Sequence, residues 1–285
     1  MKILIAADKF KGSLSAFHVC EAIKEGLSKA SPQFDVTSLP LSDGGDGLLD
    51  ILSHYKTFNQ QKFLVSDPLF RPVEACILLS EDKKTAFIEI ASASGLQLLH
   101  PEEYNCSITS SFGTGELIAH ALNLGVSTIT LGIGGSATND CGIGMAAALG
   151  FRFRDEVGEE VKPIGSNLGR IKTIDFSNAL KMDNVLVQVA CDVTNPLTGE
   201  HGATNVYGPQ KGATPQMLEE LEVGTLSFAE VVKSDLGIDV LSIKGGGAAG
   251  GMGAGCVAFL DAELISGIEL VLKLADVEKH TAEAD

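Results

Sequence analysis

Several short segments of the chain combine lysine, aspartate or hydroxyl side chains with glycine, a mixture typical of sites that bind phosphate or carboxylate groups. The first segment runs from Asp8 to Ser13 and carries Lys9 and Lys11 between an expected strand end and an expected helix start. Free backbone N–H groups and the positive end of the helix favour anions there, and two ammonium groups strengthen the effect. The segment is a candidate anion site, and two solvated surface lysines are the alternative.

The second segment, residues 42–47, places Asp43 and Asp46 among three glycines. An aspartate in such a loop can orient a hydroxyl group, accept its proton or hold Mg²⁺ through oxygen. A turn capped by an aspartate side chain is the structural alternative. A calcium loop of the EF-hand type is excluded, because the ligand spacing and the downstream glutamate are missing.

The third segment, residues 109–116, leads into a helix expected over Leu117–Leu124. Its hydroxyl groups, among them that of Thr114, could bind phosphate or simply cap this helix. Capping is the interpretation that the segment favours by itself.

The fourth segment, Gly132–Asp140, follows an expected strand and precedes a Gly/Ala-rich helix, so its amides could cradle phosphate. The segment also matches the loose G-x-G-x-x-A dinucleotide pattern, with Asp155 in range for a ribose-binding acid, and an NAD-dependent dehydrogenase is therefore an alternative. No Walker A lysine follows the glycines, which excludes a P-loop NTPase. The candidate phosphate ligands of this segment are Gly134, Gly135, Ser136, Ala137, Thr138 and Asn139.

Two further candidates lie in the second half of the chain. Asp192 follows an apolar strand expected over Val185–Cys191, and a carboxylate at a strand end is often functional, with a structural turn as the alternative. Lys211 lies in a Gly/Pro loop ahead of a helix whose start is marked by Thr214 and Pro215. Its ammonium group could contact a phosphate or be exposed to solvent.

Other chemistries find little support. The chain has no G-x-S-x-G segment, and its six histidines lack the spacing of a catalytic triad or a metal site. Its six cysteines include no C-x-x-C pair, so we expect reduced thiols. A formal net charge of −16 argues against broad binding of nucleic acid or of an anionic membrane. No apolar run reaches membrane-spanning length and the N-terminus is typical of a strand, so we expect a cytoplasmic protein.

The elements that must position these side chains repeat as an apolar strand, a polar loop and an amphipathic helix. This alternation indicates an α/β fold with largely parallel sheets, whose ligands gather at the carboxyl ends of the strands. The pattern is interrupted near Phe58–Pro72, and the Gly-rich stretch Lys244–Gly255 is expected to separate the last helices from the rest. We expect two α/β domains with a cleft between them, in which the glycine-bearing turns converge. Further strands are expected over Lys2–Ala7, Val36–Leu41 and Ser127–Ile133, and further helices from about Ser15, from about Leu48 and over Gly142–Leu149.

A series of longer motifs runs in order through nearly the whole chain: DKFKGSLSA, SDGGDG, SDPLFRPVEA, IEIASASGL, TSSFGTGELI, GIGGSATNDCGIGMAAALG, ACDVTNPLTG, YGPQKGAT and GGGAAGGMGAG. In this order and spacing they resemble the bacterial type of glycerate kinase. The resemblance implies two α/β domains, one flavodoxin-like and the other inserted into it. We assign residues 1–60 and about 256–285 to the flavodoxin-like domain, and residues 61–255 to the inserted domain.

The resemblance also implies an activity, the ATP-dependent phosphorylation of glycerate with Mg²⁺, and 2-phosphoglycerate is the favoured product. Lys9 and Lys11 would bind the substrate carboxylate or the migrating phosphoryl group. Among Asp43, Asp140 and Asp192, one would orient the attacking hydroxyl and another would help to hold the metal. We place Asp43 near the acceptor and Asp192 near Mg²⁺, with both as metal-ligand candidates.

The expected partners are small molecules, ATP and glycerate, and neither nucleic acid nor a membrane; a homo-oligomer is left open. The nucleotide phosphates would lie on the Gly134–Asn139 loop, with Thr114 and Lys211 as further ligands.

Three departures from the family pattern stand out. Asp46 stands where glutamate is usual, and Cys141 stands where glycine is usual. Members of the family continue beyond the position of Asp285, so we expect a chain truncated at its C-terminus whose flavodoxin-like domain is incomplete. An inactive fragment of the kinase is therefore a third interpretation of its function.

Overall fold

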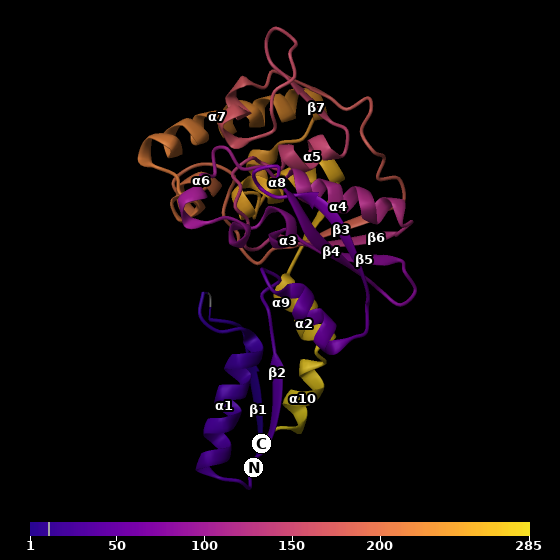
Figure 1. Ribbon diagram of the computed structural model, residues 1–285, viewed down its shortest axis with the longest axis vertical. Coiled ribbons are helices and arrows are strands. Elements are labelled where there is room, and N and C mark those ends of the chain that lie inside the picture. The colour runs from indigo at the N-terminus through magenta and orange to yellow at the C-terminus, as the bar shows by residue number, and fades with distance from the viewer. Residues whose placement is uncertain (11) are drawn as a thin grey trace.

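A computed structural model of the chain describes residues 1–10 and 12–285. Helices and strands alternate along it, which confirms the α/β fold class. In Figure 1 the molecule is elongated, with a small part at its lower end that contains β1 (Lys2–Ala7), α1 (Ala16–Ala30) and β2 (Asp35–Pro40). The two strands of this part are parallel neighbours. Both chain termini lie at the same end.

The larger part is built on a mixed sheet. Within the described residues its six strands follow the order β10-β9-β6-β5-β4-β3. The first four of these are parallel neighbours, as the sequence predicts, whereas β4 pairs antiparallel with both β5 and β3. Its strands are β3 (Asn59–Ser66), β4 (Pro72–Leu79), β5 (Thr85–Glu89), β6 (Thr128–Gly132), β9 (Leu186–Ala190) and β10 (Glu263–Ile265), and a separate antiparallel pair joins β7 (Arg152–Arg154) to β8 (Thr173–Asp175).

Several helices begin where local capping chemistry predicts. The hydroxyl of Ser15 accepts the amide of His18 at 3.3 Å at the start of α1, and that of Thr214 accepts the amide of Met217 at 3.3 Å. None of the described helices is both long and apolar enough to cross a lipid bilayer. The remaining α-helices are α2 (Leu48–Tyr55), α3 (Ala91–Ser94), α4 (Phe112–Asn123), α5 (Ile143–Ala148), α6 (Ala203–Tyr207), α7 (Pro215–Leu236), α8 (Ala248–Leu260), α9 (Gly267–Leu274) and α10 (Val277–Glu283). Short 3₁₀ turns cover Leu96–Leu98, Pro101–Glu103, Gly165–Arg170, Pro209–Lys211 and Val240–Ser242.

Buried apolar side chains hold these elements together. The larger cluster packs the six-stranded sheet against α4, α5 and α8, with Ile88 and Leu117 fully buried in it. The smaller cluster joins Leu48 of α2 and Val271 of α9 to Phe87 of β5. Since α2 follows β2 directly in the chain, this second cluster fastens the small part of the molecule to the large sheet. The six cysteines are free thiols, as the sequence predicts.

The stretch Phe58–Pro72, which the sequence places outside the alternating pattern, contains strand β3. This strand pairs with β4 in a register that runs from Asn59 opposite Leu79 to Ser66 opposite Pro72. It lies at the edge of the sheet. An edge strand is covered on fewer sides than a central one, so it tolerates polar residues that hide it from an analysis based on apolar runs.

The Gly-rich stretch Lys244–Gly255 is not a separator, because most of it lies in helix α8. The backbone at Ala249–Gly251, near the start of this helix, has left-handed angles. A Cβ added at Gly250 would lie 2.0 Å from the carbonyl oxygen of Thr138. The glycines therefore allow α8 to pack directly on the loop that follows β6.

The division into two domains at residues 60 and 256 stays a prediction. Residues after 256 contribute to both parts of the molecule, because β10 pairs with β9 of the large sheet, while α10 lies beside β1.

Candidate active site

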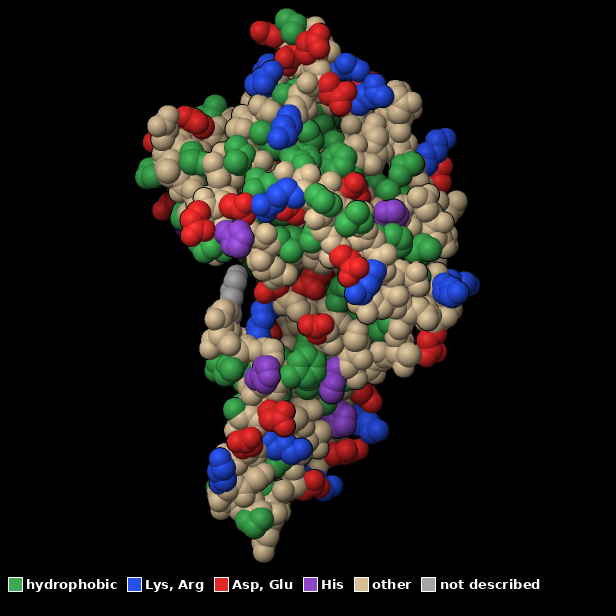
Figure 2. Space-filling view, in the orientation of Figure 1, with side chains coloured by type: hydrophobic (Ala, Val, Ile, Leu, Met, Phe, Trp, Pro, Cys, Tyr) green, Lys and Arg blue, Asp and Glu red, His purple; other side chains and the backbone are tan. Residues whose placement is uncertain are grey.

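A cavity of about 690 Å³ lies where strands β1, β2, β6 and β9 end. Figure 2 shows charged side chains in the hollow between the small and the large part of the molecule, at the level of this cavity. The predicted convergence of glycine-bearing turns at strand ends is confirmed for the described residues. The loops supply Asp8, Lys9, Gly12, Asp43, Gly44, Gly45, Asp46, Ile133, Gly134, Gly135, Ser136, Cys191, Asp192 and Val193.

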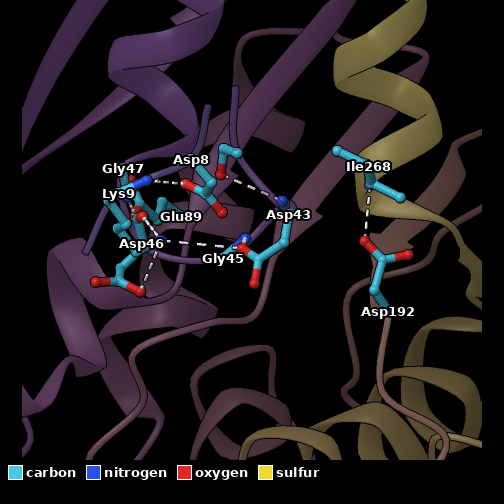
Figure 3. Close-up of polar contacts among 11 residues, drawn as sticks. Asp8, Lys9, Asp43, Gly45, Asp46, Gly47, Glu89, Asp192 and Ile268 are labelled. Atoms are coloured by element: carbon cyan, nitrogen blue, oxygen red, sulfur yellow. Dashed lines mark hydrogen bonds and ion pairs between the residues drawn. The ribbon is translucent and has the colours of Figure 1, made fainter. Parts of the chain in front are cut away.

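Lys9 is the centre of a charged cluster on one side of the cavity. Its side chain is 19% exposed, and its ammonium group donates to the carbonyl oxygen of Asp46 at 2.7 Å. The same nitrogen lies 3.4 Å from the Asp46 carboxylate and 3.9 Å from that of Asp43. Figure 3 shows these side chains facing one another, and the Asp43 carboxylate also accepts the amide of Gly45 at 2.9 Å. The cluster places a fixed positive charge next to a solvent-accessible carboxylate.

The loops after β2 and β6 touch through glycine. A Cβ added at Gly134 would lie 2.3 Å from the Cα of Gly45 and 2.7 Å from the backbone nitrogen of Asp46. Gly135 adopts φ +72°, a conformation that side chains rarely allow. Glycine at both positions thus brings the amides of the β6 loop against the charged cluster.

Asp192 lies apart from that cluster, beside the first turn of α9 (Figure 3). Its Oδ1 accepts the hydroxyl of Ser266 at 2.7 Å and the amide of Gly267 at 3.2 Å, and its Oδ2 accepts the amide of Ile268 at 2.7 Å. Oδ2 retains a lone pair that could take a further ligand. Gly267 in turn packs on the β2 loop, because a Cβ there would lie 2.5 Å from the carbonyl oxygen of Asp43. Asp192 therefore also fixes the helix that supports the charged cluster.

Lys211 is buried, with 3% exposure, although it lies in a loop where an exposed lysine is the ordinary expectation. Its ammonium group donates to the hydroxyl of Ser136 and to the carbonyl oxygen of Thr138, both at 2.7 Å. Lys211 and Ser136 both border the cavity. A second positive charge is thus held at the β6 loop.

Among the predicted site residues, Lys11 lies outside the described residues, and the others divide into two groups. The residues that border the cavity are Lys9, Asp43, Gly134, Gly135, Ser136, Asp192 and Lys211. The residues that do not are Thr114, Ala137, Thr138, Asn139 and Asp140.

Asp140 lies inside the protein, and its predicted part in catalysis stays a prediction. It is 0% exposed, and burial raises the pKa of its carboxyl group, an effect that hydrogen bonds from Ser111 oppose. Its Oδ2 accepts the amide and the hydroxyl of Ser111, both at 2.8 Å, and the amide of Gly144 at 3.2 Å. Its Oδ1 accepts the amide of Gly142 at 3.1 Å. Asp140 thus ties the starts of α4 and α5 together and does not border the cavity.

Thr114 and Asn139 are also engaged inside the protein. The hydroxyl of Thr114 pairs with that of Ser94 at 2.8 Å, and the side-chain amide of Asn139 donates to the hydroxyl of Thr204 at 3.0 Å. Ala137 is 1% exposed, and its carbonyl oxygen accepts the hydroxyl of Thr109 at 2.9 Å. These contacts stabilise the loops that line the cavity, and the role of these residues as phosphate ligands stays a prediction.

The sequence analysis missed other residues at or near the cavity. Tyr104, Tyr207 and Gln210 border it near Lys211; Tyr207 ends α6 and Gln210 lies in the following 3₁₀ turn, in a motif whose only candidate ligand was Lys211. Glu89, the last residue of β5, lies beside Asp46 in Figure 3 and is 8% exposed. In the sequence, Glu89 is the charged residue of the otherwise apolar strand segment in the motif IEIASASGL, and this feature could have identified it as a candidate.

The residues present are compatible with a hydrated Mg²⁺ ion. No group of three or more His, Cys, Asp or Glu side chains that could hold a metal occurs in residues 1–10 and 12–285. Mg²⁺ commonly uses only one or two protein carboxylates and completes its shell with water and phosphate oxygens. Asp43 and Asp192 each have carboxylate capacity left for such a contact.

Comparison with known proteins agrees with this geometry. The model of the glycerate kinase family matches residues 3–285. A glycerate kinase of Bacillus cereus is 46% identical over 286 residues, which cover 100% of this chain and 75% of the relative. A glycerate 2-kinase of Escherichia coli K12 is 45% identical over 281 residues, which cover 98% of this chain and 74% of the relative. The chain belongs to the glycerate kinase family.

A solved structure is also similar to this chain. A crystal structure of a candidate glycerate kinase 2 from Salmonella typhimurium LT2 matches with a TM-score of 0.85 and 47% sequence identity, covering 100% of this chain and 76% of the other. Membership of the glycerate kinase family speaks against the dehydrogenase alternative. Asp155, the acid that this alternative needs, lies in the loop after β7 and accepts the amides of Val157 and Glu159 at 3.2 and 3.0 Å, away from the cavity.

Proposed function

We propose that this chain transfers the γ-phosphoryl group of ATP to the 2-hydroxyl of glycerate, with Mg²⁺. The observation that carries the proposal is one cavity, bordered by Lys9, Asp43, Gly135 and Asp192, in a chain 45% identical to a glycerate 2-kinase of Escherichia coli. Phosphoryl transfer depends on positioning and on charge stabilisation more than on covalent catalysis. A cavity with two separated lysines and accessible carboxylates meets those requirements.

On the side of the β2 loop, we place the acceptor. Lys9 would bind the substrate carboxylate or the migrating phosphoryl group, since its ammonium is held within 4 Å of two carboxylates and its side chain is only 19% exposed. The Asp43 carboxylate would orient the attacking hydroxyl and take up its proton. Its side chain is 63% exposed, so it can reach a bound molecule without moving the backbone.

On the adjoining β6 loop, we place the nucleotide phosphates against the backbone of Gly134 and Gly135, with the Ser136 hydroxyl and the Lys211 ammonium beside them. Lys211 is already held by two hydrogen bonds, so its charge is positioned before the nucleotide binds. Mg²⁺ would lie near Asp192, with Asp43 as the second candidate ligand, and would neutralise charge on the phosphates. A cytoplasmic location and a homo-oligomeric state stay predictions.

The proposal is tested by identifying the product. The purified chain is incubated with ATP, Mg²⁺ and glycerate, and the phosphorus spectrum is recorded with proton coupling. Phosphate on the 2-hydroxyl couples to one proton and gives a doublet, whereas phosphate on the 3-hydroxyl couples to two and gives a triplet. A doublet is expected. A triplet would reject the 2-hydroxyl as acceptor, and no glycerate-dependent consumption of ATP would favour an inactive chain.

A further inference from the structure

Glu89 connects the large sheet to the charged cluster without bordering the cavity. It ends β5 and is 8% exposed, and its Oε1 accepts the backbone amide of Gly47. Gly47 is the N-cap of α2, has φ +88° and offers no side chain to cap the helix. The carboxyl group of Glu89 thus accepts the amide of the N-cap residue itself, as a glutamate at the third helical position does in a capping box.

The hydrogen bond between Glu89 and Gly47 lies next to the cluster around Lys9. Asp46 precedes Gly47 in the chain, and its carbonyl oxygen accepts the Lys9 ammonium at 2.7 Å. The Asp46 carboxylate lies 3.4 Å from the same nitrogen. Figure 3 shows the four residues in one group. A displacement of the Gly47 amide would therefore displace both atoms of Asp46 that hold Lys9.

Keeping an acid at this position is costly, which argues for a specific role. Burial, together with the nearby carboxylates of Asp46 and Asp50, raises the pKa of Glu89 to about 7, although the amides of Gly47 and Leu49 oppose the shift. Asp46 and Asp50 are the charged groups of the described chain that act on it, one from the β2 loop and one from α2. An apolar residue would avoid this cost but would leave the Gly47 amide without an acceptor.

We propose that Glu89 is a positioning residue for phosphoryl transfer, which fixes the backbone between Asp46 and α2 and thereby sets the place of the Lys9 ammonium. The proposal rests on the function proposed above. Of the two roles given to Lys9, it takes the contact with the migrating phosphoryl group, and it therefore concerns kcat more than the binding of either substrate.

Three variants and a matched control test it. Glu89→Ala removes the acceptor and should lower kcat at least tenfold, with KM for ATP and for glycerate within about threefold of wild type. Glu89→Gln keeps an acceptor oxygen and should retain a third or more of kcat at pH 6.5; Glu89→Asp should fall between the two. The control is Glu116→Gln, because Glu116 likewise accepts a backbone amide, that of Ser66 at 2.6 Å, far from the cavity. Wild-type kcat in Glu89→Ala, or an equal loss in Glu116→Gln, would overturn the proposal.

The pH dependence distinguishes positioning from simple stabilisation of the fold. A carboxylate binds the Gly47 amide more strongly than a neutral carboxyl or an amide does. The ratio of wild-type to Glu89→Gln kcat should therefore rise between pH 6 and pH 8, with a midpoint near the pKa of about 7. Titration of ATP affects both proteins equally and cancels in this ratio. A ratio that stays constant or falls with pH would contradict the proposal.

As pH rises, the stability of wild type relative to Glu89→Gln should fall, whereas its relative kcat should rise. The pKa of Glu89 is raised from 4.5 to about 7, so the folded protein keeps a proton that the unfolded chain has released between these pH values. The stabilisation is present below the lower value and is lost as pH rises through the higher one. The Tm of Glu89→Gln should therefore exceed that of wild type by more at pH 8 than at pH 5. If the Tm difference between Glu89→Gln and wild type is the same at both pH values, Glu89 does not have the raised pKa of a buried acid, and this would contradict the proposal.

A readout without substrate separates this inference from the proposed function. Hydrogen–deuterium exchange should be at least tenfold faster at residues 45–50 in Glu89→Ala than in wild type, and unchanged there in Glu116→Gln. If exchange is accelerated but wild type does not phosphorylate glycerate, the proposed function fails and the anchoring of the loop stands. If exchange is not accelerated, the positioning role fails whatever the activity.

Discussion

At the scale of single residues, burial and hydrogen bonding distinguish the three aspartates that the sequence analysis proposed for catalysis. Asp140 is 0% exposed and accepts four hydrogen bonds from the starts of two helices. Asp192 borders the cavity, but its carboxylate accepts three hydrogen bonds from the start of α9. The Asp43 side chain is 63% exposed and has one partnered amide, that of Gly45. Asp43 is therefore the aspartate best placed to act on a bound hydroxyl group.

Asp43→Asn should lower kcat at least about a hundredfold, because the amide cannot take up the proton of the hydroxyl. The Tm should stay close to that of wild type, since the side chain is largely solvated. Steady-state kinetics with glycerate and ATP measure the first effect and thermal melting the second. Asp35→Asn is the control, because Asp35 is exposed at the start of β2, whereas Asp43 lies in the loop that follows the end of this strand. If Asp43→Asn keeps half of the wild-type kcat, Asp43 is not the group that orients the hydroxyl.

At the scale of elements, the cavity depends on backbone contacts between loops that end different strands. The β2 and β6 loops meet at Gly45 and Gly134, and α9 meets the β2 loop at Gly267 and Gly44. Each of these contacts is closer than any side chain allows. The glycines of the site are thus required by packing between elements, in addition to any amide that they offer to phosphate.

Gly134→Ala should destabilise the protein by about 1–3 kcal/mol, because its Cβ would collide with backbone atoms that cannot move separately. It should also raise KM for ATP at least fivefold by forcing the two loops apart. Urea denaturation and initial-rate kinetics measure the two effects.

The matched control is Gly26→Ala, since a Cβ at this position in α1 meets nothing within 4 Å. Alanine favours a helix more than glycine does, so this variant should be stabilised by up to about 1 kcal/mol with unchanged kinetics. Wild-type stability and KM in Gly134→Ala would show that the contact between the loops is dispensable.

At the scale of the whole molecule, the cavity is shared by two parts with separate sheets. Lys9 and Asp43 follow the strands of the small sheet, whereas Gly135 and Lys211 belong to the larger part. A ligand that contacts both sides would link the two parts, in addition to the apolar cluster that joins α2 and α9 to β5.

ATP with Mg²⁺ should therefore raise the Tm of the protein, and NAD at the same concentration should not. At one hundred times its Kd, a ligand that binds only the folded state adds about 2.7 kcal/mol to the free energy of unfolding. Thermal melting with each nucleotide measures the shift. A shift with NAD and none with ATP would reverse the choice between kinase and dehydrogenase.

Much of the local organisation could be read from the sequence. The strand of Lys2–Ala7 and the helix starts at Ser15 and Thr214 follow from apolar periodicity and capping, which involve only neighbouring residues. Since parallel strands end at a common edge, the order of loops also sufficed to predict that Asp43 and Asp192 border one cavity.

Tertiary structure alone decided which of these residues are buried and which face the cavity. Asp140 is enclosed by Ser111, 29 positions away, and Glu89 meets Gly47, 42 positions away, so no local pattern reveals either environment. The polar edge strand β3 and the Gly-rich helix α8 likewise depend on what they pack against. Burial and strand pairing are set by distant parts of the chain, and that is why the sequence located the site but not the division of its residues between chemistry and support.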